Sequence, residues 1–347
     1  KESGDRRAIE MFIESISPNR WPRADRLQLK AIEALGNTGG VLEEEAIKAL
    51  GISLAWGNHS GSISRGSKRF AAESASALGK FNNPSAVDLL LKAFVHSSMK
   101  DEGETRRAIT QSLGEIAERR GDDKALAESL ASAVEPLIES LGDSEFSRSN
   151  RHPWQGPIGA LGHIGDGRAV GPLISLMEES EDMGLKGEIA ESLGRIGGDQ
   201  VFEAIVKAIG PDLRYTERGE IGFITGLGHL GDQRATPLLI SWLDYLVHLR
   251  NGRDPGRGWH FQFAIGSLGQ IGDEEAVVPI LHAYAEEQGR QTDWRKEESK
   301  DAALERRDRT MDKNREVAKY ALVSIGENGR DILTGLSDGL YSDTFSE

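Results

Sequence analysis

Residues 160–166 read Ala-Leu-Gly-His-Ile-Gly-Asp, and the phrase returns as Gly-Leu-Gly-His-Leu-Gly-Asp at 226–232 and as Ser-Leu-Gly-Gln-Ile-Gly-Asp at 267–273. Its leucine recurs eight times, at Leu35, Leu78, Leu113, Leu161, Leu193, Leu227, Leu268 and Leu322. Glycine follows seven of these leucines, and Val323 follows the last. The intervals between them are 43, 35, 48, 32, 34, 41 and 54 residues. Self-similarity at such a period predicts a repeat array, in which insertions lengthen some of the units.

Each unit is predicted to contain two helices, which we call helix A and helix B. Helix A carries the Leu-Gly phrase, because apolar residues such as Ile189, Leu193 and Ile196 recur at helical spacing. The glycine of Ile-Gly-Asp can adopt the left-handed conformation that ends a helix, and the aspartate can cap the next segment. Helix B is expected to begin close to a proline, which only the opening turn tolerates. These prolines are Pro136, Pro172, Pro237 and Pro279.

The glycine after the leucine lies inside the predicted helix A, where it costs up to about 1 kcal/mol relative to alanine. A costly residue that nevertheless recurs in seven of eight copies indicates that two helices approach each other closely at this point. We expect this contact between the paired helices A and B of one unit.

The extended phrase Ala-x-x-Leu-Gly-x-Ile-Gly-Asp-x-x-Ala-Val-x-Pro-Leu-Ile resembles the HEAT-like repeats of the phycobilin lyase repeat superfamily. The clearest matches are residues 158–177, 224–242 and 265–283, and the resemblance extends over residues 24–337. It implies a solenoid, because a single helix pair cannot bury its own apolar face and must stack on its neighbours. It implies no single function, since such repeats occur in bilin lyases, in protein-interaction scaffolds and appended to unrelated enzymes.

The predicted fold is therefore an all-α, right-handed α-solenoid of about eight HEAT-like helix pairs. Residues 1–23 are expected to form an N-terminal capping helix and loop, residues 24–337 the solenoid, and residues 338–347 an acidic C-terminal tail. Insertions are placed near residues 55–67, 143–153, 249–258 and 289–312. The last insertion mixes both charges and is interpreted as a solvated extension of helix B, as a mobile loop, or as a clamp for a partner.

Composition excludes several classes of function. The chain has 42 Lys and Arg against 56 Asp and Glu, a net charge of −14, which disfavours a general affinity for nucleic acid or anionic lipid, although a local basic patch is compatible with it. The absence of cysteine excludes disulfides, thiolate metal sites and a cysteine nucleophile. No apolar run reaches the roughly 18–20 residues of a membrane span. We expect a cytoplasmic protein, and a first residue of Lys1 is compatible with a removed leader.

No catalytic or metal-binding residues are predicted. There is no His-Glu dipeptide, which excludes the helical zinc-hydrolase motif. It also separates the chain from deoxyhypusine hydroxylase, a HEAT-like enzyme that binds its irons through His-Glu pairs. His163 and His229 both follow Leu-Gly, but two repeats place them on the order of 20 Å apart, too far to share one ion. We interpret the position that they share as a solvated polar position.

Candidate binding residues gather at the junctions between repeats. Five of the six tryptophans lie there: Trp21, Trp56, Trp154, Trp259 and Trp294. Each junction leads into a helix A, so we expect these residues in loops or at helix starts along one edge of the solenoid, which we call the Trp/Arg edge. Its proposed members are Trp56, His59, Arg69, Arg151, His152, Trp154, Arg214, Arg218, Arg257, Trp259 and His260. Trp and Arg are enriched at binding hot spots. In the alternative interpretation each Trp fills the gap that its own insertion creates.

Two functions remain open. The first is a non-catalytic scaffold, without a cofactor, that binds a protein partner through an extended surface. The second is implied by the resemblance: phycobilin lyases of the E/F type hold an open-chain tetrapyrrole and attach it to a cysteine of an antenna protein. In that case Arg would pair with the propionates and Trp would stack on the pyrrole rings. A lesion-recognising HEAT-like glycosylase needs a basic channel, which the charge of −14 disfavours.

Overall fold

The computed structural model describes residues 2–15, 26–38, 42–59, 65–96, 103–142, 156–210, 219–249, 260–283 and 318–326. Every regular element in these ranges is a helix, and they contain no strand. The chain divides into two compact units, Lys1–Leu176 and Met177–Glu347, and the boundary falls within α11 (Val170–Glu179).

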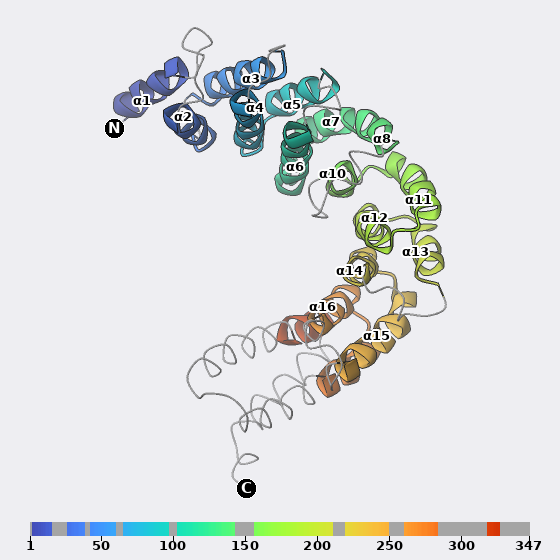
Figure 1. The fold of residues 1–347 in the computed structure, drawn as a ribbon. Helices are drawn as coiled ribbons and strands as arrows, with labels where there is room; N and C mark the ends of the chain where they lie inside the picture. The colour runs from blue at the N-terminus through green and yellow to red at the C-terminus, as the bar shows by residue number, and fades with distance from the viewer. Residues whose placement is uncertain are drawn as a thin grey trace, which may run out of the picture. The chain divides into compact units, whose positions relative to one another are not determined.

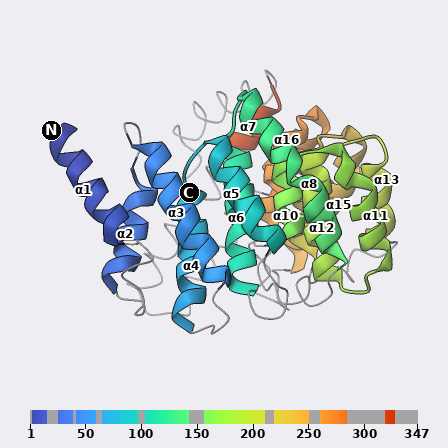
Figure 2. The same ribbon diagram turned by 90° about the horizontal axis from the view of Figure 1, so that it is seen from above.

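Unit 1 contains two rows of helices (Figure 1). Its A helices, each in contact with the next, are α2 (Arg26–Gly36), α4 (Arg65–Leu78), α6 (Gly103–Arg119) and α10 (Pro157–Ile164). Its B helices are α3 (Glu43–His59), α5 (Pro84–His96), α7 (Lys124–Ser132) and α8 (Val134–Leu141). The N-terminal helix α1 (Glu2–Ser15) packs on α2 and α3. Seen from above, α4 and α6 run side by side (Figure 2).

Unit 2 repeats this arrangement. Its A helices are α12 (Met183–Ile196), α14 (Glu220–Leu230) and α16 (Phe261–Ile271), again each in contact with the next. Its B helices are α13 (Val201–Ile209) and α15 (Thr236–Leu249). Two further helical segments, 277–283 and 318–324, correspond to helix B of the seventh repeat and helix A of the eighth. The expected all-α solenoid of stacked helix pairs is therefore confirmed.

The core consists of the leucines that defined the repeat. All eight leucines of the phrase have side chains with at most 1% exposure. Trp242, the one tryptophan that the sequence places in a helix B, is fully buried in α15. The period of the sequence thus identifies the residues that hold one helix pair against the next.

The predicted caps are present after α10, α14 and α16. The glycines that follow these helices have left-handed φ angles of 74°, 68° and 74°. The aspartates Asp166, Asp232 and Asp273 each accept an N–H bond from the residue two positions later, at 2.9–3.1 Å. Each aspartate opens a single 3₁₀ turn, η2 (Gly167–Ala169), η4 (Gln233–Ala235) or η5 (Glu274–Ala276), before helix B begins.

A helix of the B row begins close to each of the four prolines, although in the third repeat this is α8, and the row already begins there with α7 at Lys124. The helices start at Val134, Val170, Thr236 and Val277, one or two residues before Pro136, Pro172, Pro237 and Pro279 respectively. The missing N–H of proline therefore falls in the opening turn, where no helical hydrogen bond is lost.

The recurrent glycine packs against a different helix from the one expected. A β-carbon built on Gly36 would lie 2.9 Å from Cβ of Ala77, and one on Gly79 would lie 2.5 Å from Oγ of Ser112, both on the next helix A. In unit 2 the contact is between backbones, because a β-carbon on Gly194 would overlap the carbonyl oxygen of Gly226. The prediction of close A–B pairing within a unit was wrong: the glycine lets successive A helices approach.

The described part of the first predicted insertion, near residues 55–67, is helical. α3 continues through Ala55 to His59, and α4 begins at Arg65, so most of the stretch near 55–67 is helical. The stretch contains no proline, and a single internal glycine costs a helix only about 1 kcal/mol. The insertions near 143–153 and 289–312, nearly all of 249–258 and the tail 338–347 lie outside the described residues.

We predict that Gly194→Ala destabilises unit 2 by about 1–3 kcal/mol, because the new methyl group has to displace the backbone of α14. The matched control is Gly266→Ala in the middle of α16, where nothing lies within 4 Å of the built β-carbon. That control should stabilise the protein by up to about 1 kcal/mol through helix propensity. Urea unfolding followed by circular dichroism measures both changes. Equal effects of the two variants would contradict the A–A packing.

Candidate functional site

The structure describes four of the eleven predicted edge residues. Trp56 and His59 lie in the last turn of α3, and not in a loop or at a helix start as predicted; Arg69 lies in α4, and His260 immediately precedes α16. The other seven, Arg151, His152, Trp154, Arg214, Arg218, Arg257 and Trp259, lie outside the described residues. The Trp/Arg edge as one surface therefore stays a prediction.

Arg69 is available to solvent. Its Nε lies 3.8 Å from Oε1 of Glu73 one turn later, and the two side chains are 64% and 48% exposed. An exposed pair of this kind contributes less than about 1 kcal/mol, so the guanidinium can exchange Glu73 for another carboxylate at little cost.

His260 has a different environment from the one expected for an edge residue. Its Nδ1 lies 3.5 Å from Oε2 of Glu220, the first residue of α14, and the two side chains are only 12% and 1% exposed. The contact joins the starts of two successive A helices. His260 therefore belongs to the packing between α14 and α16, because its place in the helical period turns it toward the preceding helix A.

Within each unit, the A helices leave one side for solvent. The other sides contact neighbouring A helices of the same unit and helices of the B row. Helical periodicity places the residues nine, five and two positions before the leucine, and two positions after it, on the remaining side, which we call the A face. Its described, solvent-accessible members are Arg26, Lys30, Glu33, Asn37, Arg69, Glu73, Ser76, Lys80, Glu104, Ala108, Gln111, Glu115, His163, Gly184, Glu188, Arg195, Gly222, Thr225, His229, Phe263, Gly266, Gln270, Tyr320 and Ser324.

In unit 2 the A face contains two neighbouring carboxylates on α12. Glu191 is almost fully buried and accepts a hydrogen bond from Nη2 of Arg195 at 3.1 Å. Burial raises the pKa of Glu191, although hydrogen bonds from Arg195 and Thr225 oppose this shift. For Glu188, one turn earlier, burial and the charges of Asp182 and Glu191 raise the pKa from 4.5 to about 7.

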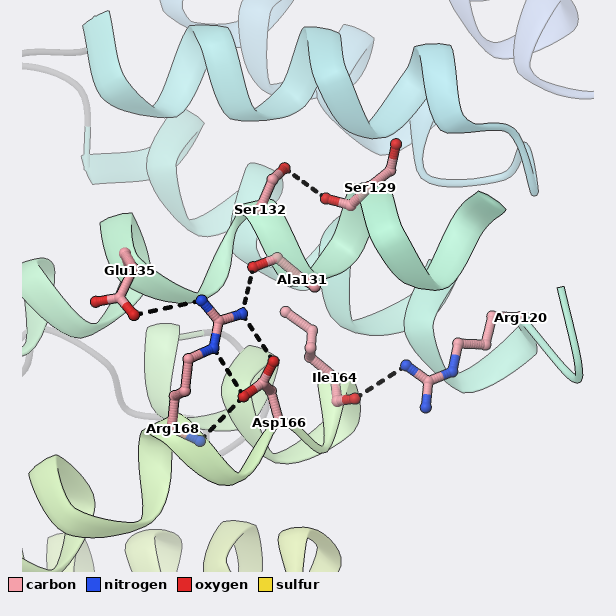
Figure 3. A network of polar contacts seen from close by, with 8 residues as sticks. All are labelled: Arg120, Ser129, Ala131, Ser132, Glu135, Ile164, Asp166 and Arg168. Atoms are coloured by element: carbon pink, nitrogen blue, oxygen red, sulfur yellow. Dashed lines mark hydrogen bonds and ion pairs between the residues drawn. The ribbon is translucent and has the colours of Figure 1, made fainter. Parts of the chain in front are cut away.

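One polar network of unit 1 joins two repeats, and the sequence pattern did not predict it. The guanidinium of Arg168 donates to both carboxylate oxygens of Asp166 at 3.0 and 2.8 Å, and to the carbonyl of Ala131 at 2.8 Å (Figure 3). It also lies 3.4 Å from Glu135 on α8 of the preceding repeat. Hydrogen bonding to Arg168 lowers the pKa of Asp166. This Asp–Arg clamp joins two repeats, and the charges of its arginine and carboxylates neutralise one another.

A second clamp has the same construction in unit 2. Arg234 donates to Asp232 at 3.0 Å and to Glu203 of α13 at 3.0 Å, and its guanidinium lies 4.3 Å from the ring centre of Phe202. The signal in the sequence was Gly-Asp-x-Arg-Ala at residues 165–169 and 231–235. The predicted cap accounts for the aspartate but not for the arginine two residues later.

The described ranges lack two further classes of site. They contain no group of three or more His, Asp or Glu side chains placed to hold a metal ion. None of their helices is both long enough and apolar enough to span a membrane.

The raised pKa of Glu188 predicts a pH-dependent stability. Because the folded pKa of about 7 exceeds the ordinary 4.5, ionisation opposes folding, and stability falls as the pH rises from about 4.5 to 7. Glu188→Gln should therefore stabilise the protein at pH 8, by at most about 3 kcal/mol, and change little at pH 4.5. Thermal melts at both pH values test this. Glu181→Gln, which removes the same charge from an exposed position, is the control and should show no such pH-dependent gain.

Comparisons with known proteins agree with the helix pairs. Residues 70–96 match the family model described as PBS lyase HEAT-like repeat. No curated protein sequence is significantly similar to the chain. A structure of human deoxyhypusine hydroxylase in complex with glycerol is matched at 16% identity over 94% of this chain and 99% of that chain, with a TM-score of 0.30, too low to support a conclusion. Residues 70–96, which hold most of α4 and all of α5, form a HEAT-like repeat of the PBS lyase type.

Proposed function

We propose that the protein is a helical-repeat scaffold that binds a protein partner through the A face and the adjoining Trp/Arg edge. The observation that carries this proposal is the contrast between a constant core and a variable face. The position before each Leu-Gly glycine is leucine in all eight repeats, and every one is buried. Two residues further on, the A face carries Asn37, Lys80, Glu115, His163, Arg195, His229, Gln270 and Ser324.

A repeated backbone that presents different polar groups at one position suits recognition of an extended partner. Each repeat supplies one set of side chains to the same face, and stacking sets their spacing. Successive A helices lie about 8–10 Å apart, so several repeats can contact one partner segment at once. A fixed array also loses little conformational entropy on binding.

The sequence register connects the Trp/Arg edge with the A face. Arg69 lies nine residues before the leucine of its repeat, and the same count from the later leucines gives His152, Arg218 and Trp259. Three of the other edge candidates thus share one register position with Arg69, which is a described A-face residue. We propose that the edge and the A face form one recognition surface.

In the test, the tagged full chain is used to capture the partner from the source cells. The affinity of the purified partner for the chain is then measured by calorimetry. The same chain is mixed with an open-chain bilin, and a red-shifted, sharpened absorption band at one bilin per chain would favour the lyase alternative. A single protein bound at a fixed stoichiometry, without such a band, supports the scaffold. Failure to retain any protein while a bilin binds would contradict it.

The edge predicts that Trp154→Ala and Trp259→Ala weaken partner binding by about 2 kcal/mol or more, the range of hot spots, and leave the melting temperature nearly unchanged. Trp242→Ala is the matched control: the fully buried Trp242 should cost about 3–5 kcal/mol of stability. Scanning calorimetry and binding titrations measure both quantities. If the melting temperatures of Trp154→Ala and Trp259→Ala are as low as that of Trp242→Ala, these tryptophans are packing residues. The prediction of a Trp/Arg edge is then wrong.

A further inference from the structure

Positive charge gathers on the A face of the first two repeats. Arg26 and Lys30 on α2, and Arg69 and Lys80 on and just after α4, are all exposed there. The same part of the face carries only two carboxylates, Glu33 and Glu73. Four cations less two anions give +2 among the described side chains of this patch, in a chain whose net charge is −14. We call these four cations the basic patch.

Among the described residues, few groups neutralise the basic patch. Nζ of Lys80 donates to the neutral Oδ1 of Asn37 at 2.9 Å, and Arg69 lies 3.8 Å from Glu73. Within the described residues, Arg26 and Lys30 make no ion pair. By contrast, Arg168 in its clamp holds two carboxylates. The charges of the patch are therefore available to a partner.

The surroundings of the patch carry both charges. Elsewhere on these helix pairs, α3 exposes Glu44, Glu45 and Lys48, and α5 exposes Asp88 and Lys92. On the next helix A, the A face carries Glu104 and the half-buried Glu115. The basic patch itself thus lies on two neighbouring helices, about 8–10 Å apart, and Arg119 at the end of α6 borders it by donating to the carbonyl oxygen of Gly79.

This pattern selects one class of ligand. A nucleic acid gains affinity from many phosphate contacts along its length, and a polyanion that extends beyond α4 would meet the carboxylates of α6. A short run of Asp and Glu can place its charges between α2 and α4. Neutral residues of the same peptide can then continue beyond the patch. Charge complementarity also speeds association and orients a partner on the scaffold.

We infer that the A face of α2 and α4 is a docking site for an acidic peptide segment of a protein partner. This inference rests on the proposed scaffold function and names the chemistry of the segment that binds its first two repeats. Arg26, Lys30, Arg69 and Lys80 supply the charges, and the stacking of α2 on α4 holds them on one surface.

The test uses the full chain and a fluorescein-labelled twelve-residue peptide of alternating Glu and Ser, with anisotropy as the readout. The variant Arg26→Glu/Lys30→Glu reverses two charges of the patch. The matched control, Lys48→Glu/Lys92→Glu, makes the same change in net charge at two exposed lysines of α3 and α5. We expect the patch variant to lose about tenfold in affinity, the sum of two reversed surface pairs, and the control to lose less than about twofold. Higher salt should weaken binding of the peptide to the parent chain.

Three outcomes overturn the inference: no peptide binding by the parent chain, equal losses in the two variants, or tighter patch-dependent binding of a twelve-nucleotide single-stranded thymidine oligomer. Circular dichroism checks folding, and Arg26→Gln/Lys30→Gln replaces the charge reversal if that variant unfolds. A chain that retains a cellular partner but does not bind the peptide keeps the proposed function and loses this inference. A chain that binds the peptide but retains no cellular partner keeps this inference and loses the proposed function.

Discussion

The close approach of successive A helices is the contact on which the rest of the structure depends. At Gly36, Gly79, Gly194, Gly228 and Gly269 a β-carbon would lie within 3.0 Å of the next helix A, so the glycine after the buried leucine allows the approach there. In unit 2 the helix backbones themselves touch at Gly194 and Gly226. In the last copy Val323 takes the place of the glycine, and its side chain is 44% exposed.

This packing also creates the surface that we propose for binding. Once helix A is enclosed by its two neighbours and by helix B, one side remains for solvent, and stacking aligns that side from repeat to repeat. The side chains on it contribute little to the core, so they are free to differ between repeats. The same backbone thus carries Lys80 in the second repeat and Glu115 in the third, and the chemistry of the face changes without a change in the fold.

Charge has two separate uses in the described structure. In the clamps, Arg168 and Arg234 are each held by an aspartate of their own repeat and a glutamate of the preceding repeat. These carboxylates neutralise the arginines, whose charge therefore joins neighbouring repeats. On the A face of α2 and α4, the cations face solvent with few carboxylates near them. The difference lies in the neighbours and not in the residue type, and it distinguishes a charge used for stability from one available to a partner.

The sequence alone determined the repeat, its buried leucines, the glycine and aspartate caps and the starts of helix B, because these follow from local periodicity and from the conformations that Gly, Asp and Pro allow. Only the tertiary structure decided which helix the Leu-Gly glycine contacts, since a glycine marks a close approach without naming its partner. The burial of His260 against Glu220 and the clamp of Arg168 on Glu135 were decided in the same way. Both join residues more than 30 positions apart, which no local pattern brings together before the repeats stack.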